Sequence, residues 1–234
     1  LFEKLLGDGS HWGIRLSYVI QDQPNGIPEA LILGEEFIGD DSVALILGDN
    51  LFYGGGLEIS LREASTRHDG ATIFCYWVSD PERYGIVEIG EDRMVKSIVE
   101  KPADPPSNYA VTGLYFYDNR AAEFARQLKP SARGELEITD LNNLYLEQGD
   151  LAVSVLGRGM AWLDTGTHES LLAAGNFIQV LEARQGLKVM APEEVAWHMR
   201  YIDDDQLREL ARPLMKSGYG EYLLGMLARR RGFR

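Results

Sequence analysis

An unbroken apolar run, residues 43–47, ends in Gly48 followed directly by Asp49 and Asn50. Such a run is typical of a strand buried on both faces, as in a parallel sheet. The acid after it would stand at the carboxyl edge of that sheet, where ligands bind in open α/β folds. A second acid, Asp164, follows another apolar segment far downstream. Together the two acids could hold a divalent cation against phosphate groups.

Each acid also fits a plain structural role. Asp49 could cap the next helix or form a turn with Asn50, and Asp164 could accept local hydrogen bonds in its Asp-Thr-Gly turn. The pair carries the functional argument, because Mg²⁺ is commonly held by one or two carboxylates plus substrate oxygens.

Charge and cysteine content exclude several classes of protein. The net charge of −13 argues against non-specific binding to nucleic acid. The single cysteine, Cys75, rules out a disulfide scaffold or a cysteine-rich zinc site and fits a reducing compartment. No apolar stretch approaches the roughly 18 residues of a membrane span. We therefore expect an acidic, cytoplasmic protein that contacts neither nucleic acid nor membranes.

The first third of the chain alternates between two periodicities. Strands are predicted at residues 14–20, 43–47 and 71–78, with helices at 28–37 and 57–67 between them. This alternation predicts βαβ units around a parallel sheet.

The pattern then changes to closely spaced strands, at residues 84–89, 94–99 and 112–117, with a hairpin turn at Gly90-Glu91-Asp92. The expected fold is α/β: a mixed, mainly parallel twisted sheet flanked by helices, Rossmann-like, with an antiparallel insertion and a helical C-terminal tail. We expect an α/β domain over residues 1–185 and a helical extension over 186–234. Its further elements are helices at 2–6, 121–128, 138–148, 193–201, 204–216 and 220–230, strands at 151–156 and 161–163, and a helix capped by Thr167 that runs to 183.

Glu100-Lys101-Pro102 follows a predicted strand. An ammonium group held there could neutralise a phosphate in this acidic protein, and Glu100 could accept hydrogen bonds from sugar hydroxyls. An exposed ion pair at a strand end explains the same residues equally well.

The segment from Gln21 to Ala30 leads from a predicted strand into a helix. Gly26 would allow a flat ligand to approach the backbone closely, and the Gln21 amide can donate and accept toward a pyrimidine edge. An ordinary Pro-Asn-Gly turn is the alternative interpretation.

Six segments in one order, LILGDN, DPERYGIVE, VEKP, SNYAVTGLYFYD, RGELEITD and WLDTGTHESLL, resemble the sugar-nucleotide pyrophosphorylases. The match extends from Leu1 to about Arg231 and is similar to the short thymidylyltransferase type. The resemblance implies a nucleotide-diphospho-sugar transferase fold. It also implies transfer of a nucleotidyl group from dTTP to glucose 1-phosphate, which gives dTDP-glucose and pyrophosphate for dTDP-rhamnose and cell-surface polysaccharide synthesis. A homotetramer is implied in the same way.

The resemblance also implies site residues. Asp49 and Asp164 match the acids that bind Mg²⁺, the implied cofactor, and Lys101 matches the lysine that binds the sugar phosphate. The implied substrate-binding set is Gln21 and Gly26 for thymine, Asn50 beside Asp49, Gly85, Glu100 and Val111 for the hexose, and Arg133 as a weaker candidate for the phosphate.

One departure from the family pattern stands out. The family begins with a strand and a glycine-rich G-G-x-G-T-R-L loop, and nothing similar occurs here; the equivalent stretch would precede Leu1. We therefore expect an amino-terminally truncated member, whose activity alone is in question. The alternatives are a UTP-using enzyme acting on another sugar phosphate and a non-catalytic nucleotide-sugar binding module.

Overall fold

The computed structural model describes residues 1–91 and 94–232. The chain divides into two compact units, Val19–Ala174 and Leu1–Tyr18 with Gly175–Arg234. The amino-terminal residues thus group with the helical end of the chain, and the division falls inside helix α7 (His168–Gln185). The expected extent of the α/β domain, residues 1–185, stays a prediction.

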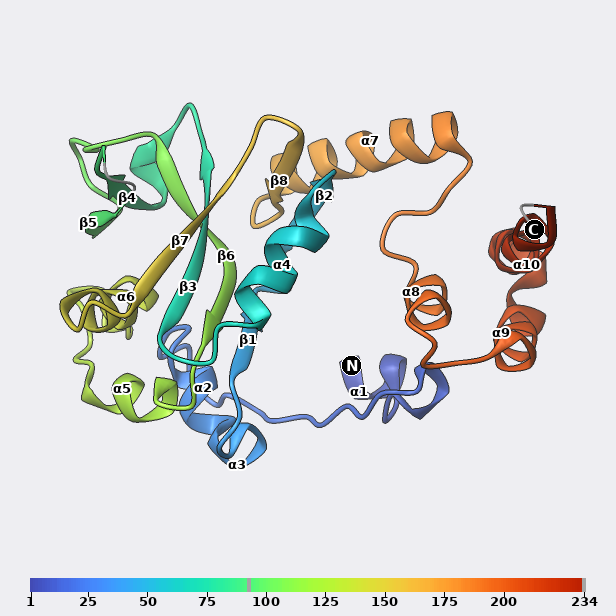
Figure 1. Ribbon diagram of the computed structural model, residues 1–234, viewed down its shortest axis with the longest axis horizontal. Helices are drawn as coiled ribbons and strands as arrows, with labels where there is room; N and C mark the ends of the chain where they lie inside the picture. Colours follow the sequence, from blue (N-terminus) through green and yellow to red (C-terminus); the bar gives the residue numbers. More distant parts are fainter. Residues whose placement is uncertain (92–93, 233–234) are drawn as a thin grey trace. The chain divides into compact units, whose positions relative to one another are not determined.

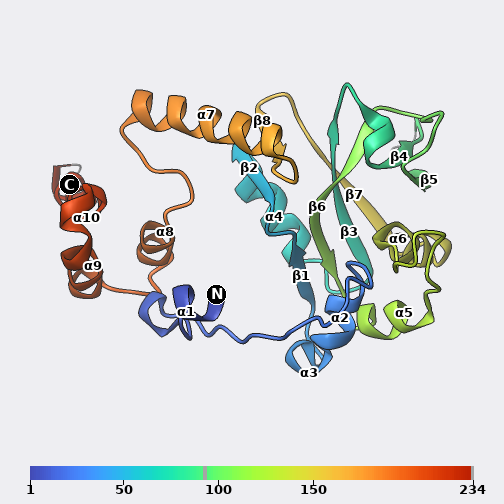
Figure 2. The ribbon, with the colours of Figure 1, turned by 180° about the vertical axis from the view of Figure 1, so that it is seen from behind.

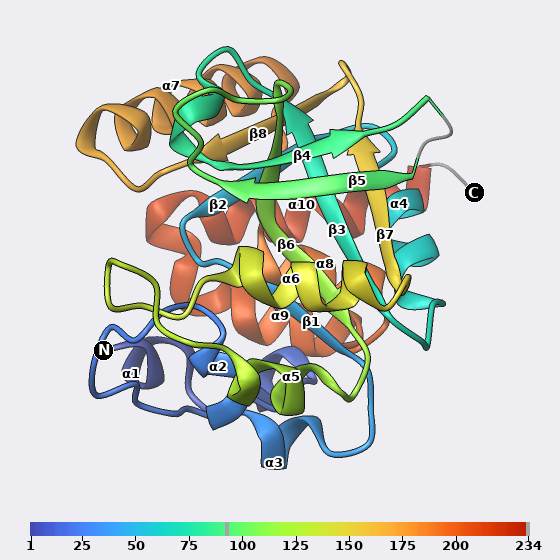
Figure 3. The ribbon, with the colours of Figure 1, turned by 90° about the vertical axis from the view of Figure 1, so that its left-hand side faces the viewer.

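A mixed sheet forms the centre of the larger unit (Figure 3). In the described part of the chain its strands follow the order β5-β4-β6-β3-β7, and β1 pairs with β6. Helix α6 lies across β5, β3 and β7. The strands are β1 (Val43–Ile46), β3 (Ala71–Trp77), β4 (Gly85–Ile89), β5 (Val95–Glu100), β6 (Tyr109–Tyr117) and β7 (Leu151–Leu156).

Strand β6 changes the expected topology. It lies between β1 and β3 and runs antiparallel to both, so that β1, β3 and β7 share one direction. The common direction of these three strands is what βαβ units predict. Among the described strands, however, β3 and β7 alone form a parallel ladder, because β6 inserts between β1 and β3. The mixed sheet with an antiparallel insertion is confirmed, whereas its mainly parallel character is not.

Alternating side chains of the sheet enter two apolar layers. On β3, Ile73 and Cys75 pack with helices α2, α3, α5 and α6, whereas Phe74 packs with α4 and with the strands β2 (Asn50–Gly54) and β8 (Met160–Asp164). A strand alternates its side chains in this way, so that both faces are covered. The helices of this unit are α2 (Glu29–Leu33), α3 (Glu35–Ile38), α4 (Leu57–Ser65), α5 (Ala121–Gln127) and α6 (Ile138–Glu147), with a 3₁₀ turn, η2 (Pro81–Arg83).

Strand β1 is less buried than its apolar sequence predicts. Val43 and Leu45 pack on the core, but Ile46 is 56% exposed. Burial alternates along β1, and the face that carries Ala44 and Ile46 is exposed. The expectation of a strand buried on both faces is wrong.

A separate two-stranded ladder joins β2 (Asn50–Gly54) to β8 (Met160–Asp164), as Figure 1 and Figure 2 show. In its register Asn50 lies opposite Asp164. No strand is predicted at residues 50–54 from the sequence, because the three strand-favouring residues 51–53 stand between Asn50 and a run of glycines.

The smaller unit is helical. It contains α1 (Phe2–Leu6), η1 (Ser10–Trp12), the second part of α7, α8 (Pro192–His198), α9 (Asp204–Ala211), η3 (Arg212–Ser217) and α10 (Tyr219–Gly232). Ile202, Leu207 and Leu223 are buried at its core.

The predicted Thr167 cap of helix α7 is confirmed, since Oγ1 of Thr167 accepts a hydrogen bond from the backbone N–H of Ser170 at 3.1 Å.

Residues 14–20 form neither helix nor strand in the described structure. The side chains of Val19 and Ile20 are largely exposed, so the apolar residues that suggested a strand there have no neighbouring strand to pair with among the described residues. The predicted turn at Gly90-Glu91-Asp92 lies partly outside the described residues. No helix within 1–91 and 94–232 is long and apolar enough to cross a membrane.

Candidate active site

A cleft of about 230 Å³ opens in the larger unit, beyond the carboxyl end of β1. Its lining comes from the turn after β1, from β4, β5, β6 and β8, and from the first turn of α6. The sequence-predicted residues that line it are Asp49, Asn50, Gly85, Glu100, Lys101, Val111 and Asp164.

The β2–β8 ladder brings the two acids together. Asp49 stands just before β2 and Asp164 ends β8. The backbone oxygen of Asp49 accepts hydrogen bonds from both N–H and Oγ1 of Thr165, each at 2.8 Å. A Cβ added at Gly166 would lie 3.1 Å from Oδ1 of Asp164 and 3.7 Å from Oδ2 of Asp49. Both carboxylates therefore flank one point in space.

Asn50 faces the protein as well as the cleft. Its Nδ2 donates to Oδ1 of Asp49 at 2.9 Å. Its Oδ1 accepts from the backbone N–H of Gly113 at 2.9 Å and from the indole N–H of Trp162 at 2.6 Å. The side-chain oxygen of Asn50 thus already has two donors, and the substrate-binding role of Asn50 stays a prediction.

Glu100 and Lys101 line the same cleft. Oε2 of Glu100 accepts a hydrogen bond from Thr139 at 2.6 Å, and Nζ of Lys101 lies 3.7 Å from Oε1 of Glu100. Lys101 has φ 42°, a left-handed conformation that side-chain-bearing residues rarely adopt. Its N–H donates to the oxygen of Tyr84 at 3.0 Å, which holds the strand end in place. The backbone thus fixes the direction of the Cα–Cβ bond of Lys101 at the end of β5.

Gly85 fits the carboxylate of Glu100 closely. The two residues lie opposite each other in the β4–β5 ladder. A Cβ added at Gly85 would lie 3.2 Å from Oε2 of Glu100 and 3.0 Å from Oγ1 of Thr139. A glycine at this position therefore leaves room for the Thr139–Glu100 hydrogen bond.

Arg133 is a neighbour of the cleft rather than part of its lining. Its Nη2 donates to Oε2 of Glu137 at 2.6 Å and lies 3.4 Å from Oε1 of Glu100. Burial raises the pKa of Glu137, but hydrogen bonds from Arg133 and Ser131 outweigh burial and hold that pKa below its usual range. The guanidinium group of Arg133 is thus already paired with the carboxylates of Glu137 and Glu100.

Gln21 and Gly26 also lie outside the cleft lining. Nε2 of Gln21 donates to the oxygen of Gly26 at 3.1 Å and to Glu29 at 2.5 Å. Gly26 has φ 107° and forms a bridge with Leu136; an added Cβ would lie 2.1 Å from the oxygen of Leu136. The glycine therefore permits a close approach of another part of this chain. Its neighbour Ile27 does line the cleft, and the thymine-binding role of Gln21 and Gly26 stays a prediction.

Sequence reasoning missed several lining residues. Trp162 is 9% exposed and packs against Tyr84, with ring centroids 5.2 Å apart. Arg83 lies over the ring of Tyr84 and donates to Oδ2 of Asp80 at 2.8 Å. Burial raises the pKa of Tyr84; the charge of Arg83 opposes this rise, and the charges of Asp80 and Asp164 add to it. Trp162 directly precedes the Leu-Asp pair, and that proximity in sequence to Asp164 was the available signal.

The two carboxylates suit a divalent cation whose remaining ligands come from a bound substrate. Within the described residues no group of three or more histidine, cysteine or acidic side chains could hold a metal. Asp49 and Asp164 supply oxygen ligands, and the missing side chain of Gly166 leaves the space against both carboxylates open. Mg²⁺ prefers oxygen ligands and is often bound through one or two carboxylates plus substrate phosphates. The residues present therefore fit Mg²⁺.

Comparison with known proteins decides the family. The model of the nucleotidyl transferase family matches residues 1–180. The chain belongs to this family.

Relatives of the chain point to one activity within the nucleotidyl transferase family. The chain is 60% identical over 228 residues to the glucose-1-phosphate thymidylyltransferase of Mycobacterium tuberculosis, covering 97% of this chain and 79% of the relative. It is 56% identical over 226 residues to the enzyme of the same name from Neisseria meningitidis, covering 97% and 78%.

Solved structures agree with the family. A Bacillus anthracis protein assigned as a glucose-1-phosphate thymidylyltransferase and crystallised with sucrose aligns with a TM-score of 0.68 and 42% identity, over 75% of this chain and 70% of the other. A UDP-glucose pyrophosphorylase with UDP-glucose aligns with a TM-score of 0.58 and 27% identity, over 69% and 64%. The nucleotide-sugar transferase fold expected from the sequence is confirmed.

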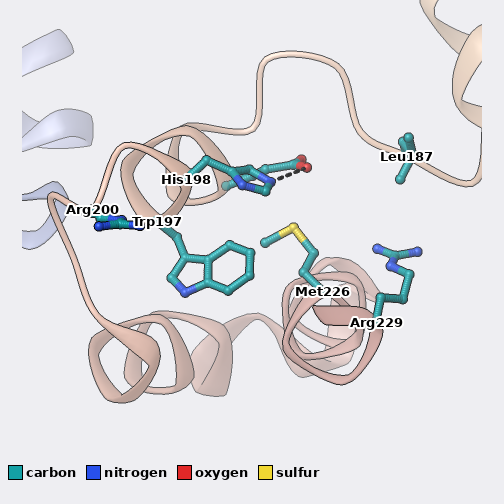
Figure 4. A pocket seen from close by; sticks show the side chains of 7 residues that line it. Leu187, Trp197, His198, Arg200, Met226 and Arg229 are labelled. Carbon is teal, nitrogen blue, oxygen red and sulfur yellow. Dashed lines mark ion pairs between the residues drawn. The ribbon is translucent and has the colours of Figure 1, made fainter. Parts of the chain in front are cut away.

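A second cavity, of about 490 Å³, lies in the helical unit (Figure 4). It is lined by Trp197, His198 and Arg229, among others, and Nε2 of His198 lies 3.7 Å from Glu194. The sequence-predicted residues line the cleft of the larger unit and not this cavity.

Proposed function

We propose that the protein transfers a nucleotidyl group from dTTP to α-D-glucose 1-phosphate and releases pyrophosphate. The observation that carries this proposal is one cleft lined by both the Asp49–Asp164 carboxylate pair and Glu100-Lys101. The reaction needs a cation site for the nucleotide phosphates and a cationic side chain for the sugar phosphate. The chain's membership of the nucleotidyl transferase family and its thymidylyltransferase relatives support the same activity.

The chemistry requires little covalent help from the protein. A phosphate oxygen of the sugar phosphate attacks the α-phosphorus of dTTP in line, and pyrophosphate leaves. In our proposal the ammonium group of Lys101 holds the attacking phosphate, and Glu100 accepts hydrogen bonds from sugar hydroxyls. Rate enhancement then comes from positioning and charge neutralisation, which agrees with a cleft that combines fixed carboxylates with a directed lysine.

Mg²⁺ is the proposed cofactor, held by Asp49 and Asp164. When bound, it supplies positive charge that neutralises phosphate oxygens. The two side chains keep their carboxylates against the same point beside Gly166, so the protein offers this charge a fixed place.

The wider role follows from the product. dTDP-glucose is an activated sugar that feeds dTDP-rhamnose and cell-surface polysaccharide synthesis, and we propose this use. Because dTTP and sugar phosphates are cytoplasmic metabolites, we place the protein in the cytoplasm. A homotetramer is proposed from the family resemblance alone.

The direct test is turnover by the purified protein with glucose 1-phosphate and Mg²⁺, measured as pyrophosphate release with dTTP and, in parallel, with UTP. We expect faster turnover with dTTP. A preference for UTP would contradict the thymidylyl assignment and favour the uridylyl alternative, toward which the resemblance to a UDP-glucose pyrophosphorylase structure points. Binding of dTDP-glucose without pyrophosphate release would favour a non-catalytic module.

A further inference from the structure

We propose that Asn50 is a positioning residue for the cation site. Its amide group holds Oδ1 of Asp49, so that the other oxygen, Oδ2, faces Asp164. This inference rests on the proposed function only for its ligand, a divalent cation. It does not depend on which nucleotide or sugar the protein uses.

The orientation of the Asn50 amide is determined by its neighbours. The backbone N–H of Gly113, at 2.9 Å, and the indole N–H of Trp162, at 2.6 Å, both meet Oδ1 of Asn50. Both groups are donors only, so the oxygen of the amide must face them. The NH₂ end is therefore turned toward Asp49, where it donates to Oδ1 at 2.9 Å.

Packing prevents the amide from moving away. A Cβ added at Gly113 would lie 2.6 to 2.8 Å from three side-chain atoms of Asn50, so the amide sits directly on the backbone of β6. The backbone N–H of Asn50 donates to the oxygen of Leu47 at 3.1 Å, and the N–H of Leu47 donates to the oxygen of Gly113 at 2.9 Å. The first bond closes the turn after β1, and the second attaches that turn to β6.

The consequence reaches Asp49. Its backbone oxygen is held by Thr165 and its Oδ1 by Asn50. Of the two carboxylate oxygens of Asp49, Oδ2 lies nearer to the point beside Gly166. The carboxylate of Asp164 lies next to the same point. Two nearby carboxylates repel each other when no cation is bound. The Asn50 hydrogen bond opposes that repulsion by keeping Asp49 in the conformation that a cation requires. Partners of this kind, which orient a ligand without touching the metal, commonly change metal affinity 10- to 100-fold when mutated.

The experiment measures Mn²⁺ binding to the purified protein directly, by electron paramagnetic resonance of free Mn²⁺, without turnover. The decisive variant is Asn50→Leu, which loses the donor to Asp49 and adds no charge beside the site. We expect its Mn²⁺ affinity to fall about tenfold. Asn50→Asp keeps an oxygen for Gly113 and Trp162 but places a further carboxylate beside Asp49, and should bind Mn²⁺ more tightly than Asn50→Leu does. Trp162→Phe, which keeps the Gly113 hydrogen bond, should lose about threefold, because one of two donors remains.

Two controls define the comparison. Asn119→Asp makes the same substitution at an exposed site, where the asparagine donates to the backbone oxygen of Asp40, and should bind Mn²⁺ as the wild type does. Asp49→Asn should abolish the site. Thermal melting of each variant confirms that it is folded.

Unchanged Mn²⁺ binding by both Asn50→Leu and Trp162→Phe would overturn the proposal, because neither the Asn50 donor nor the indole that orients it would then affect the site. Equal binding by wild type and Asp49→Asn would also overturn it, since there would be no cation site to position. Failure of the proposed function gives a different result. Mn²⁺ binding would still depend on Asp49 and Asn50, but the wild type would release no pyrophosphate from dTTP.

Discussion

At the amino ends of β3 and β7, Asp118 is 4% exposed and accepts hydrogen bonds from Gly70, Arg120 and Tyr145 at 2.6 to 3.0 Å. At the carboxyl end of β1, Asp49 accepts a side-chain hydrogen bond from Asn50 and borders an open cleft. Both are carboxylates beside the same sheet. The first has its oxygens occupied by this chain, whereas the second has an oxygen directed toward another carboxylate.

The difference separates stability from function. A buried carboxylate with a guanidinium and several donors around it contributes to the free energy of unfolding, since removing one partner leaves the other buried and unpaired. A pair of carboxylates held close together gains nothing from its own repulsion. Such a pair becomes favourable only when a cation is bound. We therefore expect mutations at the Asp49 end to lower turnover with little change in the free energy of unfolding, and mutations at the Asp118 end to do the reverse.

The largest effect is expected for Asp164→Asn. Asparagine keeps an oxygen for the hydrogen bond from the backbone of Gly166, at 2.9 Å, but loses the charge. We expect kcat/KM for pyrophosphate release to fall about 1,000-fold, equivalent to about 4 kcal/mol. The free energy of unfolding in urea should remain close to that of the wild type. Turnover by Asp164→Asn at the wild-type rate would contradict a role for Asp164 in the reaction.

Asp118→Asn should show the reverse. We expect the free energy of unfolding to fall by about 3 kcal/mol, because Arg120 loses its most buried partner. Turnover at a temperature where the variant is folded should change little. A loss of turnover without loss of stability would contradict the separation of the two ends.

The effect of Asp118→Asn on the free energy of unfolding should depend on pH. Burial raises the pKa of Asp118, but hydrogen bonds from Arg120, Gly70 and Tyr145 outweigh it and hold the pKa below its ordinary value. A carboxyl group whose pKa is lower in the folded state stabilises the protein at pH values above its pKa in the unfolded state. This stabilisation is lost as the pH falls through the pKa of the folded state. The stability difference between wild type and Asp118→Asn should therefore be constant above about pH 5 and shrink below about pH 4.

Gly113→Ala tests whether the cleft end depends on close packing. The new Cβ would meet atoms of Asn50 at 2.6 to 2.8 Å, and Asn50 or β6 must shift. We expect destabilisation of about 2 kcal/mol, measured in urea, together with weaker cation binding. Gly175→Ala is the matched control, because a Cβ there meets nothing within 4 Å and lies in helix α7. It should be neutral or stabilising by up to about 1 kcal/mol.

The smallest effect is expected for Thr139→Val, which removes the hydrogen bond to Glu100 at 2.6 Å while keeping the side-chain shape. KM for glucose 1-phosphate should rise several-fold, in line with about 1 kcal/mol for one hydrogen bond, while kcat changes less. Thr139→Ser should restore the wild-type KM. A change confined to kcat would mean that Thr139 does not act through Glu100 on sugar binding.

The sequence predicted most helices and strands, because their apolar periodicity and turn residues are local signals. The acids at strand ends and Glu100-Lys101 were found for the same reason, and all of these residues line the cleft. Two kinds of information were not local. The insertion of β6 between β1 and β3 depends on pairing across the chain. The hydrogen bonds of Asn50 come from Gly113 and Trp162, far away in sequence.

Errors in the prediction have a common physical cause. Residues 14–20 have strand-like composition but no neighbouring strand in the described structure, and β1 has a buried-strand composition with one face uncovered. Composition reports what a segment could pack against. It does not report whether the rest of the chain supplies a partner, which is decided by tertiary contacts.

The register of β2 against β8 has a consequence for how such a chain can change over time. Asn50 lies opposite Asp164, and Asp49 precedes that pair. Inserting or deleting one residue inside either strand would turn every following side chain to the other face of the ladder. The two acids would then no longer flank the same point beside Gly166, although each residue would still be present. Length variation should therefore be tolerated only outside this ladder, as in the turn at Gly55 and Gly56, where an added side chain would meet nothing within 4 Å.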